Sequence, residues 1–457
     1  MRRRHFLKLG SQLLFGGALF TSSSSSRMAN GFISHSNKPY NVLFILADDL
    51  RADALGFMGN KIISTPNLDR LASKSTVFDN CFVTTSICPT SRVSILTGLY
   101  ASNHKIWDFQ SEINKSLWNK SLPHLFHQRD YRTGFIGKWG IGGDLPKQKY
   151  DFFEGFAGQG EYYKNGLHMQ DRLLNSFNNF IESSVDKPFF LQMSFKTPHV
   201  QDGDPEPFQA PSNFKKLYKD WTPRRHPTDS HQYFKNLPLL IQQGEGQKRY
   251  QNRYKLDEQF QHNMRQYYRL ITGMDSTIGK VINKLQMKNL LNNTIIVFTS
   301  DNGLLTGEYG LAGKWWMFEG SIRVPLLFYL PNKTPARDPR IALNIDIAPT
   351  LQKLCKLQAR ENHGLELMHP SQYYERQAFY YEHQFQTDKV IILPSSGLRT
   401  KQHKYIKFKN SGASQEFLFN IAMDPDEKYN LAKLRQYQYL LTEMRKLHDK
   451  LEYNLST

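Results

Sequence analysis

The side chains of this chain that could do chemistry stand where short apolar runs end. Asp48 and Asp49 follow one such run, and Asp301 and Asn302 follow another. Three carboxylates and one amide oxygen are hard ligands, which suit calcium or magnesium and lack the Cys/His set that zinc prefers. Either pair alone is better explained by a helix cap or a turn. The prediction of a metal site therefore depends on the two pairs meeting in space.

A candidate nucleophile lies in the segment Cys88–Thr97, CPTSRVSILT, which Gly98 follows. Pro89 fits the first position of a helix and Gly98 its end, so that Cys88 falls at or just before the N-cap. A thiol at a helix N-terminus beside Arg92 lies in a positive field, a setting that lowers a cysteine pKa and attracts anions. The alternative is a small buried cysteine in an ordinary turn. The local pattern favours neither interpretation.

Cationic side chains complete the set. Lys138 and His199 also follow strand-like runs, and Lys314 lies in a glycine-rich segment after Asp301. Taken singly, either lysine is most simply explained as a solvated charge, and His199 as a core or surface residue. Cations beside a divalent metal and a nucleophile form a site for an anionic ester. The predicted reaction class is hydrolysis of a phosphate or a sulfate ester, and the residues alone do not choose between the two.

These side chains need a scaffold, and apolar runs of strand length alternate with segments of helical spacing. This alternation predicts an α/β fold with a large, mostly parallel sheet between layers of helices. Ligands of such sheets bind at the carboxyl ends of the strands, so the polar groups above should meet at one edge. The predicted strands are 41–47, 131–136, 189–195, 294–298 and 324–329, and the predicted helices are 64–72, 121–128, 168–182, 264–287 and 346–355.

The 457 residues are enough for a large domain and a smaller one. We assign residues 38–368 to the main domain, with the polar, proline-rich stretch 201–262 as an insertion or functional lid. Residues 369–457 contain short strand-like runs and an amphipathic helix at 434–451, which predict a small C-terminal antiparallel sheet with a helix on it. Cys81, Cys88 and Cys355 are too few for a disulfide framework, and a Cys81–Cys355 bridge stays open.

Residues 1–30 read as an export signal. The string RRHFLK at 3–8 resembles a twin-arginine signal, and an apolar run at 13–20 and five serines follow it. The apolar run is too short to span a bilayer, and no cysteine follows it that could carry a lipid. We therefore expect a bacterial protein that is periplasmic or secreted, with no stable membrane anchor.

The formal net charge of +18 suits a polyanionic partner, whether nucleic acid, an anionic membrane or an acidic polysaccharide. The basic residues are scattered, and the sequence contains no finger, RNA-binding or helix-turn-helix motif. This distribution argues against nucleic acid as the partner.

The segment CPTSR at 88–92, continuing to LTG at 96–98, resembles the signature of the type I sulfatases of the alkaline phosphatase superfamily. Further blocks resemble the family in the same order along the chain, from residue 41 to the C-terminal region. They are ADDLRADALG at 47–56, TPNLDRLA at 65–72, GKWGIG at 137–142, TPH at 197–199, TSDNG at 299–303, GEYGLAGKWWMFEGSIRVPL at 307–326, DIAPTL at 346–351 and DPDEKYNLA at 424–432.

The resemblance implies an alkaline phosphatase-like fold and hydrolysis of sulfate esters. A formylglycine-generating enzyme would convert Cys88 to formylglycine, whose hydrate attacks sulfur and later expels sulfate to restore the aldehyde. The implied site has one calcium ion held by Asp48, Asp49, Asp301, Asn302 and residue 88, with Arg92 and Lys138 stabilising the hydrate, Lys314 binding sulfate oxygens, and His199 binding sulfate and protonating the leaving oxygen.

Two positions depart from the family pattern. Thr90 stands where Pro or Ala is usual, and Gly140 stands where the family generally has His, for which His104 is a nearby substitute. The leading hypothesis is an exported sulfatase that acts on a sulfated polysaccharide or oligosaccharide, motivated by the net charge and by the basic residues at 224–226. The alternatives are a phosphate mono- or diester hydrolase on the same site, and a non-catalytic polyanion-binding relative in which Cys88 stays a thiol.

Overall fold

The computed structural model describes residues 38–183, 186–368, 375–385, 390, 392–409 and 415–456. Residues Pro39–Thr457 form one compact unit. The predicted export signal at 1–30 lies outside the described residues. In the described part of the chain, every helix is too short or too polar to cross a bilayer.

The unit is built on an eight-stranded sheet with the strand order β12-β2-β11-β8-β1-β7-β3-β4. All neighbours pair in parallel except β11, which is antiparallel to both β2 and β8. This confirms the predicted mostly parallel sheet. The strands are β1 (Asn41–Asp48), β2 (Thr76–Phe82), β3 (Arg132–Lys138), β4 (Phe152–Phe156), β7 (Phe189–Pro198), β8 (Thr294–Ser300), β11 (Arg323–Tyr329) and β12 (Ala336–Leu343).

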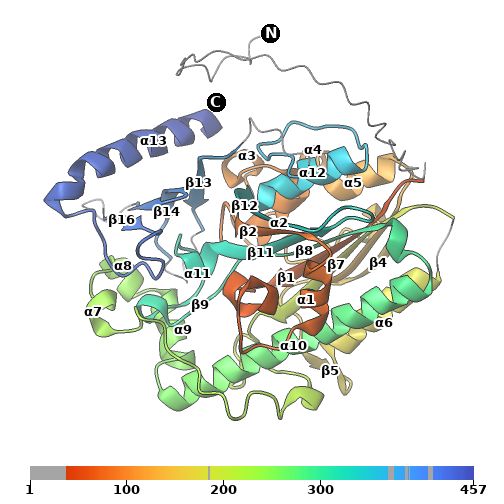
Figure 1. Ribbon diagram of the computed structural model, residues 1–457, viewed down its shortest axis with the longest axis horizontal. Coiled ribbons are helices and arrows are strands. Elements are labelled where there is room, and N and C mark those ends of the chain that lie inside the picture. The colour runs from red at the N-terminus through yellow and green to blue at the C-terminus, as the bar shows by residue number, and fades with distance from the viewer. Residues whose placement is uncertain are drawn as a thin grey trace, which may run out of the picture. The chain divides into compact units, whose positions relative to one another are not determined.

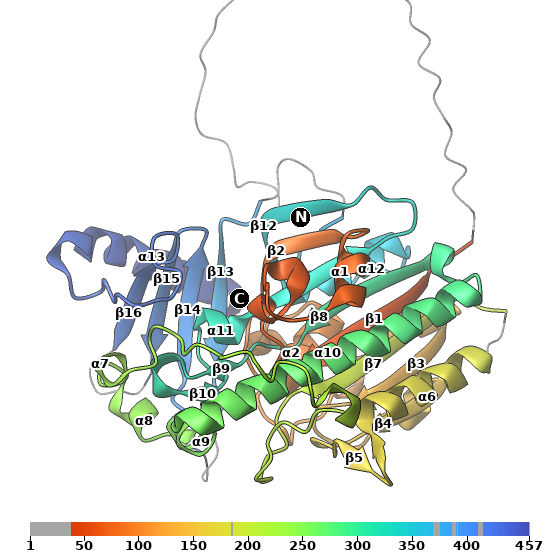
Figure 2. The same cartoon turned by 60° about the horizontal axis from the view of Figure 1, so that its bottom comes forward.

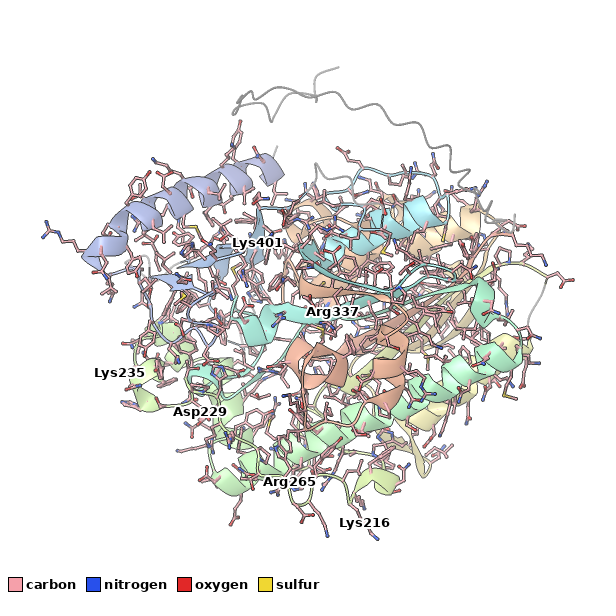
Figure 3. The ribbon with its side chains drawn as sticks, in the orientation of Figure 1. Lys216, Asp229, Lys235, Arg265, Arg337 and Lys401 are labelled. Atoms are coloured by element: carbon pink, nitrogen blue, oxygen red, sulfur yellow. The ribbon has the colours of Figure 1, made fainter. Side chains whose placement is uncertain are left out.

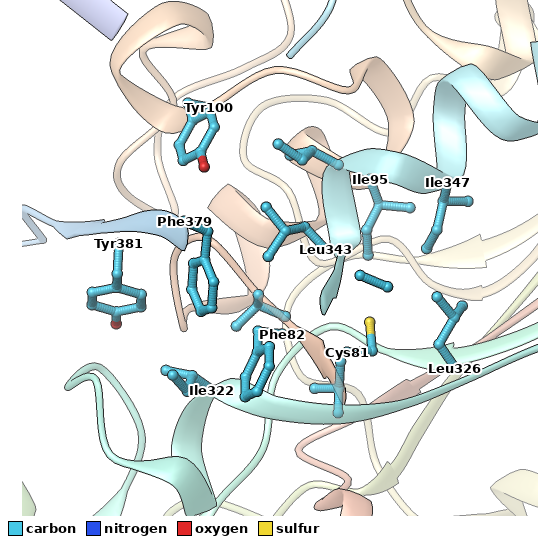
Figure 4. Packing of buried hydrophobic residues seen from close by; sticks show 14 of the residues in the cluster. Cys81, Phe82, Ile95, Tyr100, Ile322, Leu326, Leu343, Ile347, Phe379 and Tyr381 are labelled. Atoms are coloured by element: carbon cyan, nitrogen blue, oxygen red, sulfur yellow. The ribbon is translucent and has the colours of Figure 1, made fainter. Parts of the chain in front are cut away.

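Helices cover both faces of this sheet (Figure 1). Successive side chains of a strand point to opposite faces, so Phe44 packs under one helical layer and Leu43 under the other. The first layer contains α2 (Cys88–Thr97), α5 (Leu122–Gln128) and α12 (Ile347–Leu354), and the second contains α1 (Pro66–Ala72), α6 (Met169–Glu182) and α10 (Asp257–Met287). Figure 4 shows part of the first core, where Ile95 of α2 packs with Leu343 and Ile347.

The C-terminal residues form a separate antiparallel sheet, in the order β13-β14-β15-β16, with α13 packed on it (Figure 2). This also agrees with the prediction. The sheet meets the main core where Phe379 stacks on Phe82 at 5.1 Å between ring centroids. Its elements are β13 (Ala378–His383), β14 (Ser395–Thr400), β15 (His403–Phe408), β16 (Glu416–Asn420) and α13 (Gln438–Ser456).

Several element boundaries differ from the sequence-based ones. Helix α10 begins at Asp257, two turns before the predicted start, because its first turns are polar on their outer face. The insertion is less irregular than predicted, since short helices interrupt it: η4 (Ser212–Phe214), α7 (His231–Phe234), α8 (Leu239–Gln242) and α9 (Glu245–Arg253). Strands β2, β4, β12 and β14 were not predicted as separate elements.

Cys81 and Cys355 are buried and free, so the disulfide that the sequence analysis left open between them is not formed.

The remaining elements are short and connect the larger ones. They are α3 (Ala101–His104), α4 (Lys115–Trp118), α11 (Glu319–Ile322), β5 (Tyr163–Lys164), β6 (Leu167–His168), β9 (Leu305–Thr306), β10 (Ala312–Gly313), η1 (Ala52–Ala54), η2 (Gly56–Met58), η3 (Lys147–Lys149), η5 (Leu291–Asn293), η6 (Glu308–Gly310), η7 (Asn344–Asp346) and η8 (Arg435–Tyr437).

Candidate active site

The structure brings every predicted site residue to one edge of the large sheet. The parallel strands β1, β3, β7 and β8 all end there, and α2 begins beside them. None of these residues is more than 3% exposed. The residues are Asp48, Asp49, Cys88, Arg92, Lys138, His199, Asp301, Asn302 and Lys314.

Cys88 lies at the first helical position of α2, and Ile87 rather than Cys88 is the N-cap. Its Sγ is 3.0 Å from Lys314 Nζ and 4.0 Å from Lys138 Nζ, and it donates to Asp48 Oδ1 at 3.2 Å. The side chain at position 88 therefore stands between two ammonium groups and a carboxylate, where an attacking group would face a bound anion.

The expected lowering of the Cys88 pKa is wrong. Burial raises the pKa of the thiol, and Asp301 and Asp48 raise it further, by more than Lys138 and Lys314 offset. The sequence-based argument considered only the helix N-terminus and Arg92. It missed the carboxylates that the fold places beside the sulfur. Among the protein groups alone, Cys88 is a poor source of thiolate.

Arg92 is the cation at the base of the site. Its Nε donates to Asp301 Oδ2 at 2.8 Å and one Nη donates to Asp48 Oδ2 at 3.0 Å. The other Nη donates to the Lys138 carbonyl and to Ser194 Oγ, each at 2.7 Å. Through these hydrogen bonds, the guanidinium holds two carboxylates and the end of β3 in a fixed arrangement.

Gly140 is required by this arrangement. Its φ is +69°, and a Cβ there would lie 2.8 Å from Arg92 Nε. A histidine there would displace the guanidinium from the position that it takes in this chain. His104 does not replace it, because its ring nitrogens pair with Ser94 Oγ and the Ile106 amide, both at 3.1 Å.

The acidic residues fit a divalent cation. Asp48, Asp49, Cys88 and His199 each offer a ligand atom, and these atoms lie within 4.8 Å of one another. Asn302 Nδ2 donates to Asp49 Oδ1 at 2.5 Å, which leaves Asn302 Oδ1 buried without a hydrogen-bond partner. An orphaned amide oxygen beside carboxylates is the donor that a hard cation uses.

The carboxylates differ in their proton affinity. Burial opposes ionisation of Asp48, but Lys138, His199, Arg92 and Lys314 overcome it and lower its pKa below the usual range. For Asp49, burial prevails over the attraction of Lys314 and raises the pKa to about 6. Asp48 is therefore the more firmly ionised of the two.

A loop that the sequence analysis missed holds two of the site residues. Lys138 Nζ donates to Gln159 Oε1 at 2.6 Å, and Tyr162 Oη donates to the His199 carbonyl at 2.6 Å. The fully buried Lys196 ties the loop down, because its Nζ donates to the Gly160 carbonyl at 2.9 Å. The signal in the sequence was the pair of glycines around Gln159, which take φ of +62° and +63°.

The basic residues at 224–226 are not part of the site. Arg225 donates to Asp229 at 2.7 Å and to Asp257 at 2.8 Å, and His226 pairs with Thr228 at 2.8 Å. Arg225 and His226 thus fasten the insertion together. The sequence analysis took residues 224–226 as a sign of a sulfated substrate, and the contacts of Arg225 and His226 within the insertion give that interpretation no support.

Comparisons with known proteins agree with the geometry. The sulfatase family model matches residues 40–357, and the model for the C-terminal part of N-sulphoglucosamine sulphohydrolase matches residues 307–454. The chain is 26% identical to the N-acetylglucosamine-6-O-sulfatase of Bacteroides thetaiotaomicron, over 89% of this chain and 85% of that protein.

Solved structures share the fold. One, described as a complex with its substrate D-glucosamine-2-N,6-O-disulfate, has a TM-score of 0.74 at 25% identity and covers 92% of this chain and 98% of that one. The phosphonate monoester hydrolase of Agrobacterium radiobacter has a TM-score of 0.75 at 21% identity, covering 91% and 96%, which shows the fold alone. The match of one family model over most of the chain is decisive: the chain belongs to the sulfatase family of the alkaline phosphatase superfamily and is a sulfuric ester hydrolase.

Proposed function

We propose that this protein is an exported sulfatase that removes sulfate from a sulfated oligosaccharide or polysaccharide, using formylglycine made from Cys88 and one calcium ion. The observation that carries the proposal is the position of Cys88 between Lys138 and Lys314, beside the buried carboxylates. The sulfated-sugar substrates named for the relatives support a carbohydrate substrate. The net charge of +18 also favours a polyanion.

Asp48, Asp49, Asp301 and Asn302 would hold the calcium ion, with residue 88. When bound, the ion would supply positive charge to the oxygens of the ester, and the hydrated aldehyde at residue 88 would supply a nucleophile that can release sulfate. Because Cys88 is 0% exposed in the folded chain, a formylglycine-generating enzyme would have to act before folding. This order is compatible with a twin-arginine signal, which exports folded proteins.

The protein groups have separable roles. Lys314 and Lys138 would bind the oxygens that carry developing negative charge, and Arg92 would keep Lys138 and Asp48 in register. The Nδ1 of His199 pairs with the Val200 carbonyl at 2.7 Å, which assigns the proton to Nδ1 and leaves Nε2 facing Asp49 and the site. Burial and Lys138 hold the pKa of His199 well below its usual value. His199 is therefore neutral in the free protein, with Nε2 unprotonated. To protonate the leaving oxygen, Nε2 would first take up a proton, which the negative charge of a bound sulfate ester favours.

The two-part organisation into residues 38–368 and 369–457, with 1–30 as the signal, remains part of the proposal. Bacterial relatives such as the N-acetylglucosamine-6-O-sulfatase support an exported enzyme. The periplasm or the exterior of the cell is where a sulfated polysaccharide would be met. Twin-arginine export is tested by fractionating cells that produce either the full chain or a variant with Arg3 and Arg4 changed to lysine. Retention of the variant alone in the cytoplasm would support this route.

The proposed activity is tested by rates on matched sulfate and phosphate esters. We expect the modified enzyme to hydrolyse saccharide sulfates faster than the corresponding phosphates. A higher kcat/KM for the phosphates would establish the phosphate ester hydrolase instead. Binding of sulfated glycans without any turnover, by a protein whose Cys88 peptide retains its thiol, would establish the non-catalytic relative.

Removal of divalent metal is expected to reduce the turnover of sulfate ester by about 100-fold or more, because several kcal/mol of charge stabilisation are lost. Calcium should restore the rate better than magnesium, since carboxylate and amide oxygens on separate loops suit the larger and more flexible coordination shell. Added calcium should also raise the Tm of the chelated protein. Full activity after exhaustive chelation, with no shift in Tm on adding calcium, would contradict the metal assignment.

Replacement of Gln159 by leucine is expected to lower kcat about 10-fold, because Lys138 loses a charge-assisted hydrogen bond of about 1.5–3 kcal/mol and its Nζ keeps only the ion pair with Asp48. KM should change less than kcat, since Gln159 acts through Lys138. Gln286→Leu, on the exposed face of α10, is the matched control and should retain the wild-type kcat. An unchanged kcat for Gln159→Leu in a protein of normal Tm would remove Gln159 from the proposal.

A further inference from the structure

Two arginines of the insertion lie one helical turn apart on α9, beside the active site. Residues i and i+4 of a helix share a face, so Arg249 and Arg253 point in the same direction. The helix lies close against the loop that carries Lys314, because Gly246 has no side chain: a Cβ there would be 2.7 Å from the Trp316 ring. Through α9, the insertion therefore contacts the loop that carries Lys314, at the sheet edge where the site lies.

Arg249 is connected to the sulfate-binding side of the site. Its guanidinium carbon lies 4.9 Å from the centroid of the Trp315 ring. Trp315 directly follows Lys314, whose Nζ is 3.0 Å from Cys88 Sγ. The guanidinium of Arg249 covers the indole of Trp315, which is only 4% exposed. The outer edge of the guanidinium lies at the rim of the site.

Arg253 is connected to the other side, where His199 lies. One of its Nη atoms donates at 2.7 Å to Asp202, three residues after His199. Burial raises the pKa of Asp202, but His199, Arg249, Arg253 and Lys314 together lower it to about 2. Asp202 is therefore a carboxylate in a positive field. Helix α9 contacts Asp202 through Arg253 and the residues after Lys314 through Gly246 and Arg249.

The two guanidinium groups have donors to spare. Arg249 donates its Nε hydrogen to Glu245 Oε1 at 2.7 Å, and Arg253 donates from one Nη to Asp202. In the described part of the chain, these are the only hydrogen bonds that the two guanidinium groups make with carboxylates. Their side chains are 22% and 12% exposed, so they reach solvent. Two like charges one turn apart repel each other, and an oxyanion between them would relieve the repulsion and accept paired N–H bonds.

We propose that Arg249, Arg253 and Asp202 form a subsite for a second oxyanion, a sulfate or a carboxylate, on the sugar whose sulfate ester is cleaved. The inference rests on the proposed function: His199 protonates the leaving oxygen, so the sugar lies on its side of the site, next to Asp202. The arginines bind the second anionic group. Asp202 accepts a hydrogen bond from a sugar hydroxyl and holds Arg253 in place when no sugar is bound.

The test compares saccharide pairs that differ by one anionic group. The first pair is D-glucosamine 6-sulfate and D-glucosamine-2-N,6-O-disulfate, followed by sulfated disaccharides with and without a uronic acid. Wild-type kcat/KM should be about 10-fold or more higher for the member with two anions, since a bidentate arginine contact contributes about 1.5–3 kcal/mol. In Arg249→Gln and Arg253→Gln this preference should be lost through KM. On the singly charged member, kcat/KM should fall much less, since that sugar makes no ion pair with the arginines.

Lys248→Gln is the matched control, because it removes a neighbouring charge of α9 from an exposed position. It should leave both kcat/KM values unchanged. An equal loss on both members of a pair, or no preference in the wild type, would overturn the subsite while leaving the sulfatase activity established. No hydrolysis of any saccharide sulfate by protein with modified Cys88 would overturn the proposed function itself.

Discussion

Cys88→Ser is expected to lower steady-state hydrolysis of sulfate esters by about 10⁵-fold or more, as loss of a catalytic nucleophile does in other hydrolases. A serine hydroxyl at this position could accept sulfate once, between Lys314 and Lys138. It could not expel the sulfate afterwards, because it lacks the second hydroxyl of a hydrated aldehyde. Wild-type protein should turn over continuously. The variant should give at most one equivalent of alcohol per chain, with sulfate retained on residue 88.

Mass measurement of the peptide that contains residue 88 accompanies the kinetics. In active wild-type protein, this peptide should have a carbonyl oxygen in place of the thiol sulfur. Cys355→Ala is the matched control, because it removes another buried free thiol, which packs in the apolar core, and should leave turnover unchanged. Wild-type turnover with an unmodified thiol, or full turnover by Cys88→Ser, would contradict the role of Cys88.

Arg92→Met is expected to have the largest effect on stability. Arg92 is 3% exposed, and its loss leaves Asp301 buried without its ion-pair partner, while Asp48 keeps only its lysine partners, Lys138 and Lys314. Breaking a buried ion pair by removing one partner costs about 3–5 kcal/mol of the free energy of unfolding. The Tm should fall by on the order of 5–10 °C. Turnover should fall as well, because Asp48, Asp301 and Lys138 lose their common anchor.

Two further variants separate the charge of Arg92 from its geometry. Arg92→Lys keeps the charge but cannot reach both carboxylates and the Lys138 carbonyl, so its Tm should be intermediate and its turnover low. Arg337→Met removes a surface arginine that pairs with Asp79 (Figure 3) and whose side chain is 54% exposed. It should change stability by less than about 1 kcal/mol. Thermal unfolding that is equal for Arg92→Met and the wild type would contradict this account.

The sequence by itself determined the local structure and the identity of the groups at the site. The apolar run before Asp48 predicts a buried strand, which the structure has, and Pro89 and Gly98 mark the two ends of α2 within one residue. The rule that ligands bind at the carboxyl ends of parallel strands then placed the polar clusters on one edge. These inferences succeeded because strand periodicity, helix ends and strand order depend on near neighbours in the chain or on general topology.

Only the tertiary structure decided how these groups act on one another. The pKa of the Cys88 thiol is raised first by its burial and then by Asp301, which is more than two hundred residues away in the chain. The overlap of a Cβ at Gly140 with Arg92 and the hydrogen bond from Lys138 to Gln159 likewise depend on how separate loops pack. The same is true of α9, which Gly246 allows to lie against Trp316. Such contacts are set by packing at a distance of a few ångströms, which no local pattern in the chain encodes.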